Sequence, residues 1–203
     1  MRRTHLPSAP FVFDALQRLV GAHAAKRRFV EDEVRARPDA RVLDLGCGMG
    51  ALLEHLRPGA SYVGVDISPR YVRAARERYG PAGAFVCADA ASFRAADGER
   101  FDVAMAFGLF HHLDDDQARG AFAAAGSALR PSGRLVVAEP CATPERPLVE
   151  RTLMALDRGA FVRGPEEYVS LAKHAFPDVH VRVLRGELRI PYSLALLEAR
   201  PAP

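Results

Sequence analysis

The chain has 203 residues, of which 49% are hydrophobic and 26% charged, and its formal net charge is +3. This length and composition indicate one globular domain, residues 1–203, and exclude a disordered or fibrous chain. The small net charge gives no basis for a nucleic-acid-binding surface. No apolar run reaches the length of a membrane span and the N-terminus carries no secretion signal, so we expect a cytoplasmic protein.

The first residues predict helices. After a lead-in of about ten residues, residues 11–20 and 24–35 carry apolar faces at helical spacing, with Gly21 between them. Residues 1–37 are therefore interpreted as an N-terminal helical cap. Such a cap either covers an active site or only packs on the sheet, and the sequence does not decide between the two.

Residues 41–50, Arg-Val-Leu-Asp-Leu-Gly-Cys-Gly-Met-Gly, predict a buried strand that ends in a glycine-rich turn. Residues 51–56 resume with helical spacing, so we expect a helix after the turn. Glycines at alternate positions let the backbone turn tightly and approach a ligand closely. The start of a helix also favours an anionic group of that ligand.

The spacing of this turn distinguishes two ligands. The dinucleotide fingerprint is G-x-G-x-x-G, whereas Gly46, Gly48 and Gly50 form G-x-G-x-G and follow Asp44. A carboxylate at this point disfavours a pyrophosphate and favours a ligand that carries a cation. The four residues match the first motif, D/E-x-G-x-G-x-G, of the class I S-adenosylmethionine-dependent methyltransferases, which the chain resembles here.

Further strands alternate with helices along the chain. Because strands joined through helices are parallel, their carboxyl ends are expected to form one edge at which a ligand binds. The predicted strands are 62–66, 83–88, 101–107 and 134–138, and the predicted helices run from Ser68-Pro69 to Tyr79 and from Asp114 through Leu129.

The last third breaks the alternation. Residues 146–160 carry a helical pattern, Gly164-Pro165-Glu166-Glu167 begins another helix, and residues 179–184 and 188–197 predict an antiparallel hairpin. The predicted fold is therefore α/β: a Rossmann-like, doubly wound, mostly parallel seven-stranded sheet with an antiparallel strand near one edge. Residues 38–140 form its cofactor-binding core, and residues 141–203 supply acceptor-side helices and the hairpin.

The sequence gives no metal site. Cys47, Cys87 and Cys141 lack C-x-x-C spacing and support neither a zinc site nor a disulfide framework. The acidic run 114–116 suits a helix start better than a metal site.

The resemblance implies S-adenosylmethionine as cofactor, with S-adenosylhomocysteine as product. It places Asp44 at the ammonium, Asp66 at the ribose, Asp89 at the adenine amine and Ile67 against the adenine face. The cofactor-binding residues it implies are Asp44, Gly46, Cys47, Gly48, Gly50, Asp66, Ile67, Asp89, Ala90, Phe107 and Gly108. Asp66 and Asp89 are also plausible as turn residues without a ligand.

Three residues are candidates for catalysis. His111 and His112 follow the strand 101–107, and an imidazole titrates near neutrality. His111 is the preferred base, although either histidine could instead orient the loop. Glu139, at the end of the strand 134–138, is either a third candidate or an acid that stabilises a turn.

The acceptor is expected to be a small molecule. No Asn/Asp-Pro-Pro-Tyr/Phe motif, typical of the enzymes that methylate nucleic-acid bases, follows the strand 101–107. The alternatives are a methyltransferase that acts on RNA or protein, a protein that binds the cofactor without transfer, and a nicotinamide-dependent oxidoreductase. Side chains that could line an acceptor pocket, or could instead be structural or exposed, are Arg163, Tyr168, His174 and Tyr192. Nothing in the sequence indicates an oligomeric state.

Overall fold

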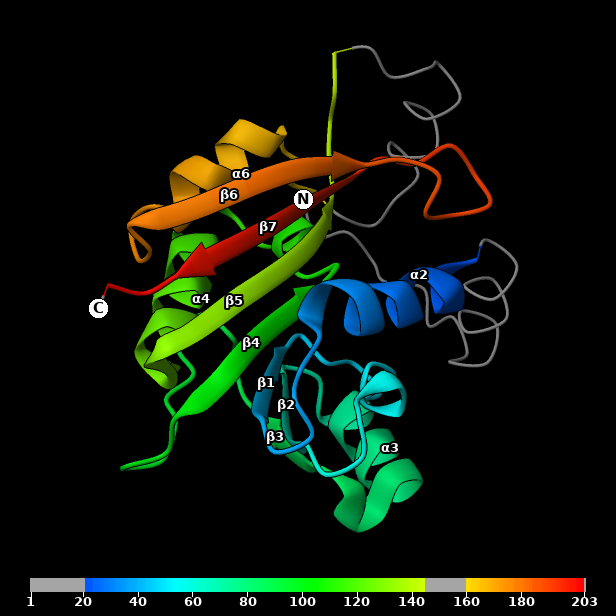
Figure 1. The fold of residues 1–203 in the computed structure, drawn as a ribbon, viewed down its shortest axis with the longest axis vertical. Helices are drawn as coiled ribbons and strands as arrows, with labels where there is room; N and C mark the ends of the chain where they lie inside the picture. Colours follow the sequence, from blue (N-terminus) through cyan, green and yellow to red (C-terminus); the bar gives the residue numbers. More distant parts are fainter. Residues whose placement is uncertain (1–20, 145–159, 203) are drawn as a thin grey trace, which may run out of the picture.

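The computed structural model describes residues 21–144 and 160–202. Seven strands form one sheet in the order β3-β2-β1-β4-β5-β7-β6 (Figure 1). The strands are β1 (Arg41–Leu45), β2 (Ser61–Asp66), β3 (Ala84–Cys87), β4 (Phe101–Phe107), β5 (Leu129–Pro140), β6 (Asp178–Leu184) and β7 (Leu194–Arg200). The α-helices are α2 (Ala22–Arg28), α3 (Pro69–Tyr79), α4 (Asp115–Ala128) and α6 (Pro165–Ala172).

The sheet has the predicted doubly wound topology. β1 pairs in parallel with both β2 and β4, so the order of the strands reverses between β1 and β4. β7 is antiparallel to β5 and to β6, which makes it the antiparallel strand near the edge. In such sheets a ligand binds outside the carboxyl ends of the strands at the reversal. The fold prediction is confirmed.

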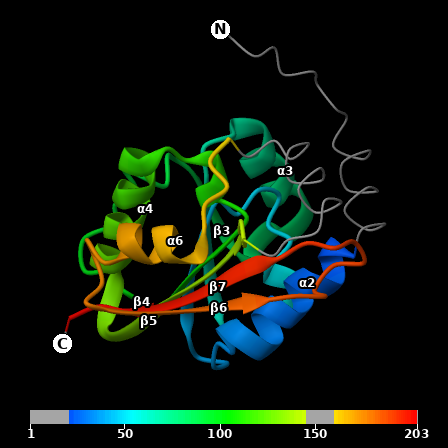
Figure 2. The same ribbon diagram turned by 90° about the horizontal axis from the view of Figure 1, so that it is seen from above.

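Apolar side chains cover both faces of the sheet. Leu43, Leu45 and Phe122 belong to the core between the sheet and the helices α4 and α6. Val42 belongs to a second core, which the sheet forms with α3 and with residues 29–34, directly after α2. Because alternate residues of a strand point to opposite faces, Asp44 lies on the same face as Val42. Figure 2 shows α2 on one side of β6 and β7 and α4 and α6 on the other.

The segment 24–35, predicted as one helix, consists of an α-helical part and a π-helical part. α2 passes at Phe29 into a π-helix, η1 (Phe29–Val34), which ends at Arg35 in a left-handed conformation with φ 41°. The helix expected over residues 11–20 lies outside the described residues, as does the one over 146–160 except for Ala160, which is in a bend.

The prediction of an α-helix directly after the glycine turn is wrong. Residues 49–52 form turns, and only a single 3₁₀ turn, η2 (Leu53–His55), follows. Leu56 is extended, and Pro58 disfavours a helical conformation of Arg57, so too few residues remain between Gly50 and the proline for an α-helix. The turn therefore offers backbone N–H groups to a ligand without the end of an α-helix behind them.

The starts of two strands lie five or more residues from their predicted positions. β7 begins at Leu194, six residues later than expected, because residues 188–193 form bends and coil that include Pro191, which has no N–H for a ladder. β5 begins at Leu129 instead of Arg134, and its pairing with β4 shifts register between Phe101 and Val103.

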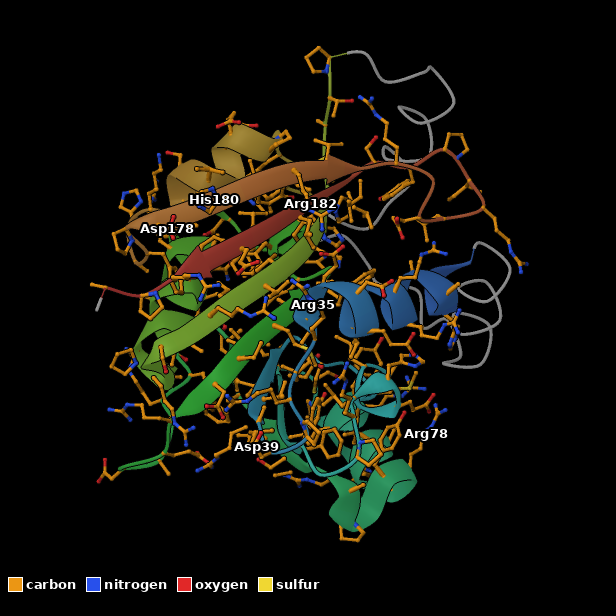
Figure 3. The ribbon with its side chains drawn as sticks, viewed as in Figure 1. Arg35, Asp39, Arg78, Asp178, His180 and Arg182 are labelled. Atoms are coloured by element: carbon orange, nitrogen blue, oxygen red, sulfur yellow. The ribbon has the colours of Figure 1, made fainter. Side chains whose placement is uncertain are left out.

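The outer strand β6 carries polar side chains at alternate positions. Figure 3 shows Asp178, His180 and Arg182 along this strand, and Arg182 forms an ion pair with Glu33 of η1. Charged side chains on an edge strand discourage pairing with another chain. Within the described ranges, no helix is long and apolar enough to cross a membrane.

Helix α4 begins where the sequence predicts, and the structure shows a capping box at its start. The Asp114 side chain accepts from the Gln117 N–H at 2.9 Å, and the Gln117 side chain accepts from the Asp114 N–H at 3.1 Å. We expect Asp114→Ala to lower the free energy of unfolding by about 1 kcal/mol, because an N–H of the first turn loses its partner. Urea denaturation measures this. In the control Asp116→Ala, whose side chain is 98% exposed, the change should stay within about 0.5 kcal/mol; equal losses would contradict the cap.

Candidate functional site

The carboxyl edge of the sheet brings together the residues predicted from the sequence. β1 contributes Asp44 and the glycine turn, and β2 ends at Asp66. Asp89 follows β3, Phe107 ends β4, and Glu139 is the penultimate residue of β5. Because these strands are parallel and adjacent, their ends form one continuous rim.

The three glycines of the turn have different physical roles. All have positive φ values: 73° at Gly46, 55° at Gly48 and 79° at Gly50. A Cβ atom at Gly46 would lie 2.8 Å from Leu109, and one at Gly50 would lie 2.8 Å from Phe85, so packing requires glycine at both positions. At Gly48 no atom lies within 4 Å of a Cβ. The turn is therefore open to a ligand at Gly48.

Asp66 joins the glycine turn to the loop that follows β2. Its Oδ2 accepts from the Gly48 N–H at 2.8 Å, and its Oδ1 accepts from the Ser68 N–H, also at 2.8 Å. A carboxylate has about four acceptor positions, so further hydrogen bonds to a ligand remain possible. The neighbouring Ile67 is 68% exposed, an unusual position for a large apolar side chain at the end of a central strand.

Asp44 is the most unusual group at the rim. Its side chain is buried, its Oδ2 accepts from the Tyr62 hydroxyl at 2.6 Å, and its Oδ1 is buried without any hydrogen-bond partner. Burial raises the pKa of Asp44 to about 7; the Tyr62 hydrogen bond opposes this, and the charge of Asp66 adds to it. Buried polar atoms are nearly always paired, so the orphaned Oδ1 indicates a missing partner.

The remaining predicted cofactor residues contact the rim in two ways. Asp89 accepts from the Ala91 N–H at 2.9 Å and so begins a turn, and Gly108 adopts φ 70° after β4. Cys47 and Ala90 are buried, and the Cys47 N–H donates to the Val65 carbonyl at 3.0 Å. Burial also raises the pKa of the Cys47 thiol far above its usual value, so it stays protonated. Phe107 packs edge-on against Phe29, with ring centroids 5.3 Å apart.

Glu139 holds the loop that contains both histidines. Its Oε1 accepts from the N–H groups of Leu109 and Phe110, at 2.6 and 2.8 Å. Its Oε2 accepts from the His111 N–H at 3.2 Å and lies 2.7 Å from the His111 Nδ1. Glu139 is 0% exposed and His111 5%. Because its carboxylate contacts three backbone N–H groups and one ring nitrogen of this loop, Glu139 holds the loop in position.

The two histidines have different surroundings. The His112 side chain is exposed, whereas His111 is buried against Glu139, and their ring centroids are 4.0 Å apart. Because Oε2 of a carboxylate only accepts, Nδ1 of His111 is the donor in this contact. This arrangement gives the His111 ring a fixed orientation.

Arg163 has a role that sequence reasoning missed. Its guanidinium donates to the carbonyls of Phe110 and Leu113, at 3.0 and 2.8 Å, and forms an ion pair with Asp115 at 2.7 Å. These contacts hold the far end of the histidine loop, and the side chain is 7% exposed. Arg163 therefore holds this loop, a structural role that the sequence allowed as the alternative to a place in an acceptor pocket. The partners lie about 50 residues away in the chain, so no local pattern signals them.

Two other acceptor candidates are also engaged within the protein. Tyr168 is buried and donates to the Pro140 carbonyl at 3.0 Å, and His174 is exposed with Nδ1 3.0 Å from the Ser170 carbonyl. Within residues 21–144 and 160–202, no group of three or more His, Cys, Asp or Glu side chains could hold a metal ion.

Comparison with known proteins agrees with this geometry. Residues 42–133 match a family described as methyltransferase domain. A ubiquinone biosynthesis O-methyltransferase of Azorhizobium caulinodans is 38% identical over 117 residues, which cover 55% of this chain and 45% of the relative. Across the curated relatives compared, the chain spans between 30% and 49% of their length.

Solved structures show the same fold. The pyocyanin biosynthetic protein PhzM superposes with a TM-score of 0.75 at 18% identity, covering 97% of this chain and 59% of PhzM. A phosphoethanolamine N-methyltransferase 2 of Haemonchus contortus, in complex with S-adenosylhomocysteine, superposes with a TM-score of 0.65 at 17% identity, covering 81% of this chain and 49% of its own. These neighbours share the fold of class I methyltransferases. The match of residues 42–133 to a methyltransferase domain and these folds support membership of the class I S-adenosylmethionine-dependent methyltransferases, the family that the sequence resembles.

The raised pKa of Asp44 predicts how stability depends on pH. Between about pH 4 and 7 the folded state retains the Asp44 proton that the unfolded state loses, so the native state becomes less stable as the pH rises. The carboxylate then costs on the order of 4 kcal/mol above pH 7. We expect Asp44→Asn, measured without ligand, to be more stable than the wild type at pH 8.

Urea denaturation between pH 4.5 and 8.5 measures this difference. The stability gap between Asp44→Asn and the wild type should widen up to pH 7 and then stay constant. A gap that does not change with pH would contradict the assignment of the burial cost to this carboxylate.

Proposed function

We propose that this protein transfers a methyl group from S-adenosylmethionine to an oxygen, nitrogen or carbon atom of a small molecule. The observation that carries the proposal is the buried, orphaned Oδ1 of Asp44 beside the open face of Gly48. This pair fits a ligand with a cation, such as the amino-acid end of the cofactor. A pyrophosphate, by contrast, would meet the negative charge of Asp44.

The proposed cofactor contacts follow the rim. Asp44 binds the ammonium, the Gly48 region accommodates the methionyl portion, and Asp66 accepts from the ribose hydroxyls. Ile67 provides an apolar surface for the adenine, which would cover its exposed side chain. The other proposed contacts are Gly46, Cys47, Gly50, Asp89, Ala90, Phe107 and Gly108.

Methyl transfer asks little chemistry of the protein. When bound, the cofactor supplies a methyl group that is already electrophilic, because it is attached to a sulfonium. The protein's main contribution is then to hold the acceptor in line, and proximity of this kind accounts for a large share of catalysis. A base is needed only where the acceptor loses a proton.

His111 is the proposed base. Glu139 accepts a hydrogen bond from the Nδ1–H of His111, which fixes the ring, and Nε2 is the nitrogen proposed to accept the proton of the acceptor. Glu139 itself is proposed as a positioning residue, because both of its oxygens already accept backbone N–H groups. The exposed His112 stays the alternative base.

A small-molecule acceptor is supported by the relatives. Relatives and structural neighbours include proteins of ubiquinone and pyocyanin biosynthesis, which concern small molecules.

The substrate class is tested by following the methyl group. The protein is incubated with methyl-labelled S-adenosylmethionine and a fractionated cell extract, and the label is located by mass spectrometry. We expect label in the small-molecule fraction, with Asp44→Ala as the inactive control. Label only in RNA or protein would overturn the substrate class, and binding of the cofactor without transfer to any fraction would favour a non-catalytic role.

The role of His111 is tested with His111→Gln, which retains a donor for Glu139 but removes the base. For an acceptor that loses a proton, kcat should fall by about 10²–10⁴-fold while the Kd for S-adenosylhomocysteine stays within threefold. His180→Ala on the exposed strand β6 serves as the control. An unchanged kcat would exclude His111 as the base and direct attention to His112.

A further inference from the structure

Among the residues that the structure describes, a single tyrosine donates a hydrogen bond to Asp44, the buried carboxylate of the glycine motif. The hydroxyl of Tyr62, on β2, donates to the Asp44 Oδ2 at 2.6 Å, within the range of a hydrogen bond to an ionised acceptor. Tyr62 is 3% exposed and Asp44 1%, so water does not replace this contact. Oδ1 is left as the one unsatisfied acceptor of the pair.

Glycine at position 64 makes the contact possible. In the register of β1 and β2, Asp44 lies opposite Gly64 and Tyr62 lies opposite Val42. The Tyr62 ring therefore has to extend along the strand, across position 64, to reach the carboxylate. A Cβ atom at Gly64 would lie 2.9 Å from the Tyr62 Cε1 and 2.8 Å from the Cys47 Sγ. Any larger residue at this position would displace the ring.

The tyrosine is also held from its other side. Its ring packs against Phe85 of β3, with centroids 5.6 Å apart, and a Cβ at Gly83 would lie 2.9 Å from its Cδ1. Packing of the Tyr62 ring thus fixes the direction in which its hydroxyl points.

We propose that Tyr62 is a positioning residue for the cofactor: its hydroxyl holds one oxygen of Asp44 in its ionised form and directs the other toward the cofactor's ammonium. This inference rests on the proposed function of the rim. Under this proposal Tyr62, which lies outside the glycine motif, controls the protonation state of Asp44 in which the site binds its ligand.

The groups around Asp44 support this assignment. Burial and the charge of Asp66 both favour the protonated carboxyl group, whereas the Tyr62 hydroxyl and, more weakly, Lys26 of α2 favour the carboxylate. Cys47 is the other titratable group beside the pair, and its raised pKa keeps it neutral. Tyr62 is therefore the main group that keeps Asp44 able to bind a cation near neutral pH.

The test compares Tyr62→Phe with the wild type by calorimetric titration of S-adenosylhomocysteine between pH 5.5 and 9.5. In the wild type, affinity should rise with pH through about 7, as Asp44 ionises. In Tyr62→Phe, the midpoint should move up by on the order of one pH unit, so that affinity at pH 7 falls about fivefold and largely recovers at pH 9. A midpoint that does not move would overturn the proposal, even if affinity falls equally at every pH.

Three controls separate positioning from a general loss of structure. Tyr79→Phe removes a hydroxyl that donates to the exposed Glu54 at 2.8 Å, from a ring stacked on the same Phe85, and should leave the midpoint in place. In the Asp44→Asn background, Tyr62→Phe should have no further pH-dependent effect. Binding of 5′-methylthioadenosine, which lacks the amino-acid end, should show no shift in either protein.

A measurement without ligand makes this inference independent of the proposed function. Carbon-13 NMR titration of the Asp44 carboxyl group should give a higher pKa in Tyr62→Phe than in the wild type. If this rise is seen but wild-type protein binds no S-adenosylhomocysteine at any pH, the proposed function fails, and the cofactor role of Tyr62 fails with it. If the ligand binds and the carboxyl pKa is the same in both proteins, only the role of Tyr62 is excluded.

Discussion

Four acidic side chains stand at the carboxyl edge of the sheet, and hydrogen bonds from backbone N–H groups to three of them hold the loops of the site together. Asp66 accepts from two N–H groups, Asp89 from one and Glu139 from three. Loops at this edge leave the regular ladder of the sheet, so their N–H groups need such partners. Asp44 is the exception, because no N–H group of the described chain reaches it. Asp44, which accepts no hydrogen bond from a loop N–H group, is therefore the acid that is available to bind a ligand.

The burial of Asp44 without full hydrogen bonding lowers the stability of the folded protein. A carboxylate held in the core without full hydrogen bonding destabilises the folded protein, and the raised pKa of Asp44 is the measure of that conflict. Strain of this kind persists at functional sites because the surrounding structure supports it. Here Tyr62 and Gly64 provide the support from the neighbouring strand. Binding a cation at Oδ1 would remove the conflict, so the ligand should stabilise the folded state as well as occupy the site.

The sequence predicted what depends on neighbouring residues. The glycine turn, Asp44, the strand 101–107 and the start of α4 were found where the pattern placed them, because each is determined within a few positions. The class I methyltransferase family, and with it the family's use of S-adenosylmethionine, was predicted from four residues and is confirmed. The roles of the individual cofactor and catalytic residues stay predictions.

What the sequence did not predict depends on register and on distant contacts. The Tyr62–Asp44 contact requires the pairing of β1 with β2, and the Arg163 contacts join residues about 50 positions apart. The helix expected after the glycines failed for a different reason. Its apolar spacing was correct, but Pro58 and the positive φ of Gly59, 96°, leave no room for an α-helix. An apolar pattern over only six residues does not produce an α-helix when Pro58 and Gly59 end the segment directly after it.

The alternation of side chains also limits where chemistry can occur. Asp44 and Phe107 point to the face covered by α2, whereas Glu139, which follows Ala138 of that face, points to the side of α4. The cation-binding acid and the proposed base are therefore on opposite faces of the sheet. They come together only above its edge, where the loop 108–113 leaves β4 and Glu139 and Arg163 hold its two ends. A rigid histidine loop is thus as necessary to the proposed reaction as the glycine turn, since without it the two faces would share no common site.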